Sequence, residues 1–139
     1  MRIAGEVTLE RLEILRKADA VYLDGRRPAS IRFSSPEEDA ARRDFTINGM
    51  FLDPVNDRII DHVGGQDDLR AGVIRAIGDP AARIYEDRLR MLRAVRFAAR
   101  FGFTIEPLTF DAVRAAAPHL RDIAWERIGE EIVRMLCEG

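Results

Sequence analysis

The clearest hydrophobic pattern in the chain lies between Glu86 and Phe103. At about 100° per residue, this segment has two adjacent apolar stripes and one narrow polar strip, which is typical of a helix buried over most of its circumference. Asp79-Pro80 is typical of a helix start and Gly102 of a helix end. The pattern predicts either one helix from Pro80 onward or a short helix followed by a long one. Its three sets are apolar Leu89, Leu92, Val95, Ala99 and Phe103, apolar Met91, Ala94, Ala98 and Phe101, and polar Asp87, Arg90, Arg93, Arg96 and Arg100.

The residues before this segment alternate between extended and helical patterns. Apolar triplets at 50–52 and 58–60 flank a turn-forming stretch at 53–57 and predict a hairpin. Ser34-Ser35-Pro36, followed by two glutamates, predicts a helix start with acids at the positive end of the helix dipole. The remaining predictions are short strands at 21–23, 31–33 and 73–77, a short helix after Gly64-Gly65 that ends at Gly72, and a helix or strand within 8–19.

After Gly78 the pattern changes, because every later segment has helical spacing. Beyond the long segment, these are a helix at 108–117 and a helix at 125–137, with Pro118 as the break between them. The composition of the chain therefore shifts from mixed to helical near residue 78.

These patterns predict an α+β fold. Residues 1–77 are expected to form a partial mixed sheet with short helices, and residues 78–139 an all-helical segment. Trp125 and Cys137 are expected in the core, because large aromatic residues and free cysteines are usually buried.

Length and composition describe a globular chain. Its 139 residues, 47% hydrophobic and 33% charged, are enough for one domain with a core or for two small half-domains that share an interface. No apolar run approaches the ~20 residues of a membrane span. One cysteine, Cys137, excludes an internal disulfide, and His62 and His119 as the only histidines leave no zinc constellation. We therefore expect a reducing, cytoplasmic setting without a membrane.

The charged residues are distinctive in kind. A net charge of −2 argues against binding nucleic acid by bulk electrostatics. Of the 22 basic residues only Lys17 is a lysine, so the cations are almost all guanidiniums, which bind phosphates and base edges through paired hydrogen bonds. Codon bias in a GC-rich genome explains a general excess of arginine. It does not explain their clustering on one face of 86–103, where we expect them to face a single groove.

A first candidate site is the run Arg42-Arg43-Asp44, followed by Asn48. Adjacent guanidiniums match phosphate oxygens, and Asp or Asn side chains accept hydrogen bonds from sugar hydroxyls. The run is therefore suited to hold a polyphosphate and a ribose together. An Arg-Arg-Asp triplet is also typical of a solvated surface patch, and the residues by themselves leave both interpretations open.

A second candidate site is Glu86-Asp87, followed by Arg90. Asp87 and Arg90, three residues apart on a helix, place an acceptor beside a donor, and such a pair complements the hydrogen-bonding edge of a nucleobase. The alternative is an ordinary ion pair within the helix. The apolar surroundings favour the functional interpretation, because a half-buried Asp–Arg pair needs a reason to be there.

Several longer stretches together resemble one family, the bacterial class II tRNA nucleotidyltransferases and poly(A) polymerases. Its members add CMP or AMP to the 3′ end of RNA without a nucleic-acid template. The resemblance covers roughly residues 16–138. The matching stretches are DGRRP at 24–28, RRDFTINGMFLDP at 42–54, DHVGGQDDLRAGVIRAIGDP at 61–80, EDRLRMLRAVRFAARFGF at 86–103 and ERI at 126–128.

The resemblance implies roles for individual residues. In the family the RRD motif contacts the sugar and the triphosphate, and the EDxxR motif reads the edge of the incoming base. The implied substrates are ATP and CTP, and the implied partner is the 3′ end of a tRNA-like RNA. On this sequence the sugar and triphosphate contacts fall on Arg42, Arg43, Asp44 and Asn48, the base contacts on Asp87 and Arg90 with Glu86 as a brace, and the lining of the same pocket on Arg93 and Arg96.

One family feature is missing from this sequence. Family members carry a glycine-rich loop and an Asp-x-Asp strand whose carboxylates bind two Mg²⁺ ions. No Asp-x-Asp occurs here, so the implied Mg²⁺ ligands are missing and we expect the chain to be inactive alone. The chain resembles the second half of the catalytic head followed by the start of the neck. Two hypotheses follow: an enzyme fragment that retains the nucleotide-selecting motifs, or a non-catalytic nucleotide- or RNA-binding module.

An incomplete head also leaves strand edges and apolar helix faces uncovered. We therefore expect a homo-oligomer, most simply a two-fold dimer, or a partner chain at the open surface. CCA-adding and poly(A)-adding members share these motifs, so the resemblance does not choose between the two activities.

Overall fold

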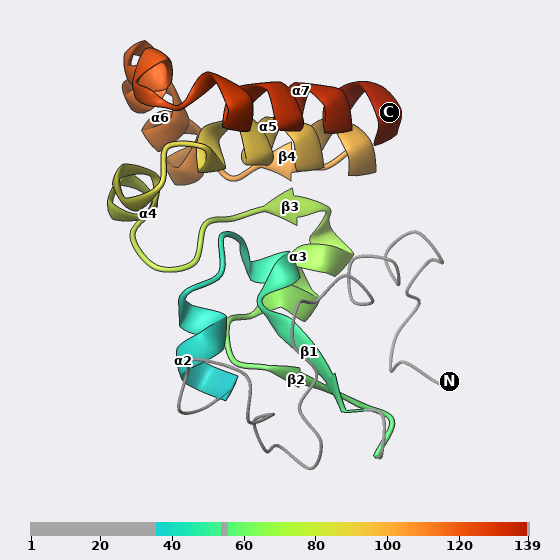
Figure 1. Ribbon diagram of the computed structural model, residues 1–139. Coiled ribbons are helices and arrows are strands. Elements are labelled where there is room, and N and C mark those ends of the chain that lie inside the picture. The colour runs from blue at the N-terminus through green and yellow to red at the C-terminus, as the bar shows by residue number, and fades with distance from the viewer. Residues whose placement is uncertain (1–35, 54–55, 139) are drawn as a thin grey trace. The chain divides into compact units, whose positions relative to one another are not determined.

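The computed structural model describes residues 36–53 and 56–138 (Figure 1). Contacts within the chain divide it into two compact units between Ala71 and Gly72. The first unit combines short helices with a hairpin and the second is mainly helical, so the α+β class expected from the sequence is confirmed. The elements expected within 8–19, 21–23 and 31–33 lie outside the described residues.

The first unit contains the expected hairpin. Its described elements are α2 (Pro36–Ala41), the 3₁₀ helix η1 (Thr46–Asn48), β1 (Met50–Asp53), β2 (Arg58–Asp61) and α3 (Gly65–Ala71). Strands β1 and β2 pair antiparallel, with Phe51 opposite Ile60. Phe51 is fully buried against Ala40 of α2, and Ile60 and Val63 pack against this pair. The hairpin therefore supplies one face of a small core and α2 the other.

Helix α3 begins at a tight corner that depends on a carboxylate and a glycine. The Asp61 carboxylate accepts hydrogen bonds from the N–H groups of Gly65 (3.0 Å) and Gln66 (2.9 Å), which satisfies donors of the first helical turn. A side chain at Gly65 would collide with the carbonyl oxygen of Thr46. Gly64, with φ +78°, supplies the left-handed turn before it. The short helix expected after Gly64-Gly65 is thus confirmed.

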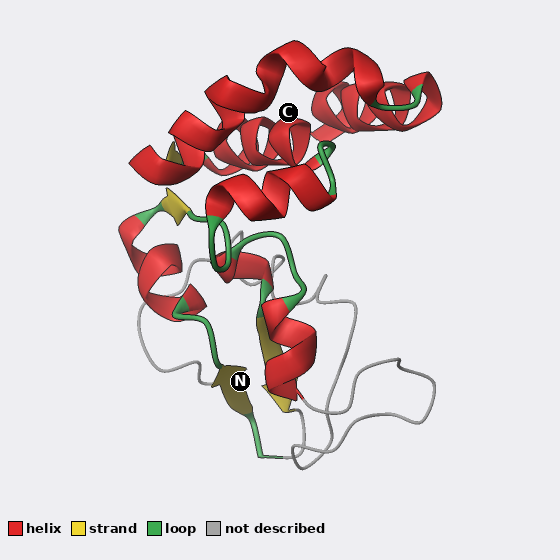
Figure 2. Cartoon of the chain, turned by 90° about the vertical axis from the view of Figure 1, so that its left-hand side faces the viewer, coloured by secondary structure: helices red, strands yellow, loops and turns green. Residues whose placement is uncertain are grey.

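The second unit contains four α-helices packed together beside two short strands (Figure 2). Its elements are β3 (Val73–Ile74), α4 (Pro80–Glu86), α5 (Arg90–Phe101), β4 (Thr104–Ile105), α6 (Pro107–Ala116), the 3₁₀ helix η2 (Ala117–Asp122) and α7 (Trp125–Glu138). Pro118, the expected break, lies in η2 between the last two α-helices. Within the described part of the chain, no helix is both long enough and apolar enough to cross a membrane.

Strand β4 corrects the prediction that only helices follow Gly78. Helix α5 ends at Gly102, whose φ of +64° turns the chain back. The returning backbone pairs in parallel with β3, and the N–H of Thr104 donates to the carbonyl oxygen of Gly72 at 2.9 Å. Strand β3 lies within the strand predicted at 73–77 but is only two residues long, and a strand as short as β4 has no periodicity long enough to recognise in a sequence. The division between the units accordingly precedes β3, earlier than the expected boundary at 77/78.

The long helical pattern is interrupted once, which confirms the second of the two alternatives. Helix α4 ends at Glu86 and α5 begins at Arg90. Between them Asp87 has an extended backbone, and its carboxylate accepts a hydrogen bond from the N–H of Leu89 at 3.1 Å. This local hydrogen bond offers the backbone an alternative to helix and separates the two segments.

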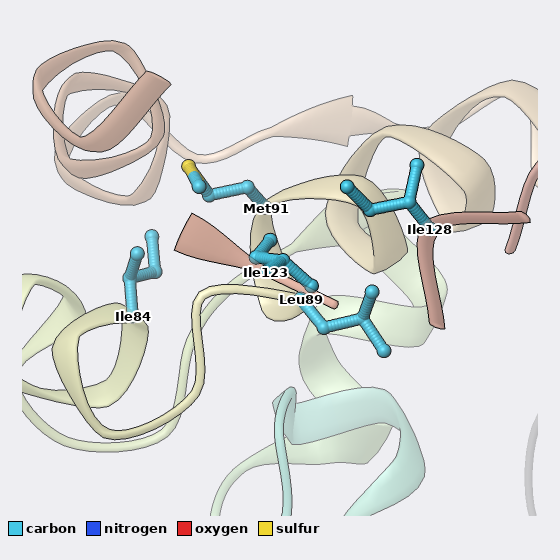
Figure 3. Close-up of a cluster of buried hydrophobic side chains, with 5 residues drawn as sticks. All are labelled: Ile84, Leu89, Met91, Ile123 and Ile128. Carbon is cyan, nitrogen blue, oxygen red and sulfur yellow. The ribbon is translucent and has the colours of Figure 1, made fainter. Parts of the chain in front are cut away.

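The core of the second unit draws on α4, α5, α7 and the segment before α7 (Figure 3). Each of its five central side chains is less than a tenth exposed, and partly buried residues of α6 and η2 pack around them. Truncating any of them to alanine would cost about 2–5 kcal/mol of stability. The five are Ile84, Leu89, Met91, Ile123 and Ile128.

Three apolar residues expected in the core are exposed. Trp125 is 76% exposed, Val95 is 46% exposed, and Cys137 is also exposed. For Val95 the reason is that α5 turns Arg96 toward α7, where Glu131 supplies a matching charge. The buried face of α5 therefore includes Arg96, a charged residue that the hydrophobic pattern places on the polar side of the helix.

Candidate nucleotide-binding site

The candidate phosphate residues Arg42 and Arg43 follow the end of α2 in the first unit. The Arg43 guanidinium lies 3.3 Å from the Asp39 carboxylate, and its Cζ lies 5.6 Å from the centroid of the Phe51 ring. The Arg43 side chain is only 14% exposed, whereas Arg42 is an exposed residue. The two arginines therefore differ: one is fixed against the hairpin and the other faces solvent.

The segment with Asp44 and Asn48 is held by short-range hydrogen bonds within the same unit. The Asn48 Oδ1 accepts from the N–H of Phe45 at 3.1 Å. The Thr46 hydroxyl donates to the buried carboxylate of Asp68 at 2.7 Å. Asp44 is half-buried at the start of this turn. Asp44 and Asn48 thus have a rigid support, and their contacts with a sugar stay a prediction.

In the second unit Glu86 accepts hydrogen bonds from two arginines. Its Oε2 lies 3.0 Å from both Arg83 and Arg90. Arg90 also donates to the backbone carbonyl oxygen of Arg83 at 2.7 Å. The hydrogen bond from Arg90 lowers the pKa of Glu86, and the charges of Arg83 and Arg90 act in the same direction. The Arg90 guanidinium is therefore oriented by a carboxylate and a carbonyl group.

Asp87 forms an ion pair through both carboxylate oxygens with Arg127, in the first turn of α7. The two N···O distances are 2.9 and 3.2 Å. Burial raises the pKa of Asp87, but hydrogen bonds from Arg127 and from the Leu89 N–H, together with the charges of Arg127 and Arg90, outweigh it and lower the pKa. Arg127 was not expected here, and its one signal in the sequence is the ERI stretch at 126–128.

This geometry corrects the expected arrangement of Asp87 and Arg90. Their spacing predicted either a base-reading pair on one helix face or an ordinary ion pair within that helix. In the structure Asp87 precedes helix α5 and is held by Arg127, whereas Arg90 is held by Glu86. The acceptor and the donor thus remain close in the chain, but each is oriented by a different neighbour.

The arginine strip predicted to face one groove is divided along α5. Arg96 is 6% exposed, and its guanidinium donates to Glu131 at 2.7 Å and to Glu138 at 2.9 Å. Arg100 also donates to Glu138, at 2.8 Å. These bonds attach α5 to α7, and removing one partner of such a buried pair costs about 3–5 kcal/mol. Half-buried Arg93 stands 5.8 Å from the Phe97 ring centroid. Nucleotide contacts by Arg93 and Arg96 stay predictions.

The expected site residues thus fall into two groups, one in each compact unit. Among the described residues, no group of three or more His, Cys, Asp or Glu side chains is arranged to hold a metal ion. The first unit holds Arg42, Arg43, Asp44 and Asn48, and the second holds Glu86, Asp87, Arg90, Arg93 and Arg96.

Protein-family models match both parts of the chain. Residues 4–75 match the "Poly A polymerase head domain", and residues 102–139 match the "Probable RNA and SrmB-binding site of polymerase A". The first of these matches alone covers half of the chain. The chain belongs to the family of CCA-adding enzymes and poly(A) polymerases.

Individual relatives carry both names. Poly(A) polymerase I of Escherichia coli O6:H1 is 49% identical over 107 residues, which are 77% of this chain and 23% of that protein. The CCA-adding enzyme of Ligilactobacillus salivarius is 45% identical over 121 residues, 86% of this chain and 30% of that protein. The chain therefore spans less than a third of the length of these relatives.

Solved structures show the same fold. The CCA-adding enzyme of Bacillus stearothermophilus in complex with CTP aligns with a TM-score of 0.72 and 40% identity, covering 84% of this chain and 29% of that one. The Thermotoga maritima CCA-adding enzyme complexed with tRNA-CCA aligns with a TM-score of 0.68 and 37% identity, covering 76% of this chain and 27% of that one. The family resemblance noted in the sequence is thereby confirmed.

Proposed function

We propose that this chain carries the nucleotide-selecting part of a template-independent nucleotidyltransferase that extends the 3′ end of an RNA with AMP or CMP. The observation that carries the proposal is the orientation of Asp87 by Arg127 and of Arg90 by Glu86. It places a fixed acceptor and a fixed donor three residues apart. Related CCA-adding enzymes have been solved with CTP and with ATP, which supports these two substrates.

Base selection follows from the chemistry of the two side chains. Adenine and cytosine each present an amino donor beside a ring-nitrogen acceptor. A carboxylate accepts from the amino group and a guanidinium donates to the ring nitrogen. Guanine and uracil present a carbonyl beside an N–H, so Asp87 and Arg90 would face groups of the wrong polarity. An unpaired polar group in such a site costs about 1–3 kcal/mol.

The first unit carries its own candidate residues for phosphate and sugar groups. Arg42 is exposed and supplies an accessible guanidinium, and Arg43 supplies one whose position is set by Asp39 and Phe51. A guanidinium fork matches phosphate oxygens. Asp44 and Asn48 are the proposed acceptors for the sugar hydroxyls.

We propose further that this chain does not transfer nucleotides by itself. The sequence contains no Asp-x-Asp pair for the two Mg²⁺ ions that phosphoryl transfer in this family is expected to use. The same observation favours a second candidate function, a non-catalytic nucleotide- or RNA-binding module. The coding sequence upstream of Met1 separates the two, because in-frame codons for a glycine-rich loop and an Asp-x-Asp strand would identify a longer enzyme.

Self-association is part of the proposal, and α7 offers the surface for it. Trp125, Ile132, Val133 and Leu136 are 76%, 45%, 57% and 80% exposed and recur on one face of the helix. Gly129 lies among them, and apart from its chain neighbours and the backbone of its own helix, no atom of the described residues lies within 4 Å of where its Cβ would be. Glycine inside a helix lowers stability by roughly 0.5–1 kcal/mol relative to alanine. Its lack of a side chain allows a second α7 helix to approach closely at this position. We propose a two-fold dimer through this face.

Titration calorimetry with the four nucleoside triphosphates tests the function. ATP and CTP are expected to bind more tightly than GTP and UTP. Equal affinities for all four would contradict base selection by Asp87 and Arg90, whatever the outcome of any assay of nucleotide addition.

A further inference from the structure

A groove lies between helices α4 and α6 of the second unit. Its volume is about 370 Å³, and four alanines of these helices line it together with Ile84. Ile84, Ala112 and Ala116 also belong to the packed core, so the floor of the groove is firmly supported. The small side chains at this position leave space that larger residues would fill.

Three side chains at the rim of this groove combine an aromatic ring with basic groups. Tyr85 is 77% exposed, and the Arg88 Cζ lies 5.7 Å from the centroid of its ring. Arg88 donates to Asp122 Oδ2 at 3.2 Å, and the His119 Nδ1 lies 3.3 Å from the same oxygen. Asp122 therefore holds Arg88 and His119 together at one edge, beside the exposed ring.

We propose that this groove binds one nucleotide of a single-stranded RNA, with its base stacked on Tyr85 and its phosphate bound by Arg88 and His119. Aromatic rings accept any base by stacking, and proteins that bind single strands combine such rings with basic groups that follow the phosphates. Arginine suits both tasks, because its guanidinium lies over ring faces and pairs with phosphate oxygens. The volume falls within the roughly 300–1,000 Å³ of small-ligand sites.

The residues around the groove favour RNA over an apolar peptide. The α6 and η2 side, with Ala112 and His119, lies within the segment that matches the RNA-binding family model. The rim offers a ring and two basic side chains, whereas a peptide anchor would need an apolar rim. The inference rests on the proposed function in that RNA is the substrate. It adds a site whose residues are separate from Glu86, Asp87 and Arg90.

Fluorescence anisotropy with a short, 5′-labelled single-stranded oligoadenylate tests the proposal on the full chain. Tyr85→Ala is expected to weaken RNA binding about ten- to a hundredfold, the range of a lost base stack. Tyr85→Phe keeps the ring and should bind as the parent does. Arg88→Gln should weaken binding and reduce its dependence on salt, because one phosphate contact is lost.

Further variants distinguish a loss of RNA binding at the groove from a loss of folding. Ala115 is an exposed groove residue, so Ala115→Leu fills the groove without removing a core contact and should also weaken RNA binding. Phe110→Ala, at an exposed apolar residue on the face of α6 opposite Ala112 and Ala115, should leave it unchanged. Photo-crosslinking with a 4-thiouridine RNA should label peptides that contain Tyr85 or His119.

The outcomes separate this inference from the proposed function. The groove proposal is overturned if the parent chain binds no RNA, if Tyr85→Ala binds RNA as well as the parent, or if RNA crosslinks only elsewhere. It is also overturned if Tyr85→Ala loses CTP and RNA together, because the effect would then belong to the nucleotide-selecting residues. RNA binding that depends on Tyr85 in a chain with no nucleotide preference would support the groove while the proposed function fails.

Discussion

Asp87, in the link between α4 and α5, is joined to Arg127 of α7 by two hydrogen bonds of 2.9 and 3.2 Å across 40 positions of sequence. Their side chains are 34% and 51% exposed. A partly exposed ion pair contributes only about 0–1 kcal/mol to stability. The main consequence of the pair is therefore the orientation of the Asp87 carboxylate, whose oxygens are the proposed acceptors for the base.

Arg127→Ala should reduce nucleotide discrimination with little effect on stability. Without Arg127 the Asp87 carboxylate loses two hydrogen bonds and keeps the one from the Leu89 N–H, so it is oriented less firmly. The preference for CTP over UTP and for ATP over GTP should therefore fall by several-fold. The free energy of unfolding should fall by about 1 kcal/mol or less. Titration calorimetry and urea denaturation measure the two effects on one preparation.

Two variants control this experiment. Arg114→Ala, at an exposed arginine of α6, should keep the discrimination of the parent. Asp87→Ala should lose it entirely. If Asp87→Ala discriminates as the parent does, Asp87 does not read the base and the interpretation of Arg127 fails with it.

Arg42 and Arg43 should both contribute to phosphate affinity, but in different ways. Arg42→Ala should weaken ATP binding without loss of stability, whereas Arg43→Ala should also destabilise the first unit, because Arg43 covers Phe51 and pairs with buried Asp39. In the parent, binding should weaken from ATP to AMP and with added salt. Arg58→Ala, at an exposed arginine of β2, is the matched control. A double Arg42/Arg43 variant that binds ATP normally would show that neither arginine contributes to phosphate binding.

The chain should self-associate through the exposed face of α7. Trp125→Glu combined with Leu136→Glu should shift sedimentation at tens of micromolar from dimer to monomer, because two charges would then have to be buried at the interface. Leu108→Glu, at an exposed position of α6 that is outside this face, should leave the dimer intact. A parent chain that sediments as a monomer at this concentration would refute the proposal.

Acid should destabilise the second unit through Glu106. Burial raises the pKa of this carboxyl, but hydrogen bonds from the N–H and hydroxyl of Thr109 and the N–H of Leu108, with the charge of Arg75, lower it below its ordinary 4.5. A lowered folded-state pKa adds stability above 4.5 that is lost as the pH falls through the folded-state value.

Urea denaturation of the parent and of Glu106→Gln measures this contribution. At pH 7 the Gln variant should be less stable than the parent, and the difference should shrink as the pH falls below 4.5. A difference that is independent of pH would show that the stability comes from packing of the side chain and not from its charge.

The isolated chain should add no nucleotides to RNA with Mg²⁺ or Mn²⁺. Two-metal transfer needs carboxylates that bridge both ions, and most of the rate enhancement comes from that electrostatic positioning. A primer-extension assay with labelled ATP or CTP and a tRNA lacking its terminal CCA measures this. Extension that survives repurification and disappears in Asp87→Ala would demonstrate a metal site within this chain.

Elements that depend on neighbouring residues were predictable from the sequence. The hairpin of β1 and β2 follows from two apolar triplets around a turn, and the end of α5 follows from Gly102. The motifs at 42–48 and 86–90 also pointed to the family, because a match between sequences is recognised residue by residue and does not depend on knowing the fold. Each of these signals spans fewer than about twenty residues, so no distant partner is needed to interpret it.

The pairing of distant side chains was decided by the tertiary structure alone. Arg127 meets Asp87 and Glu131 meets Arg96 across 40 and 35 positions, and neither pair leaves a periodic trace in the sequence. A helical pattern sorts residues by polarity, so it assigned Arg96 to a polar strip, and residue type alone assigned Trp125 to the core. A buried arginine needs a carboxylate beside it, because the ion pair offsets the cost of desolvating the guanidinium. A tryptophan is exposed where no other element packs against it. Both outcomes depend on how α5 and α7 pack against each other, and this packing is set by the tertiary structure and not by any short stretch of sequence.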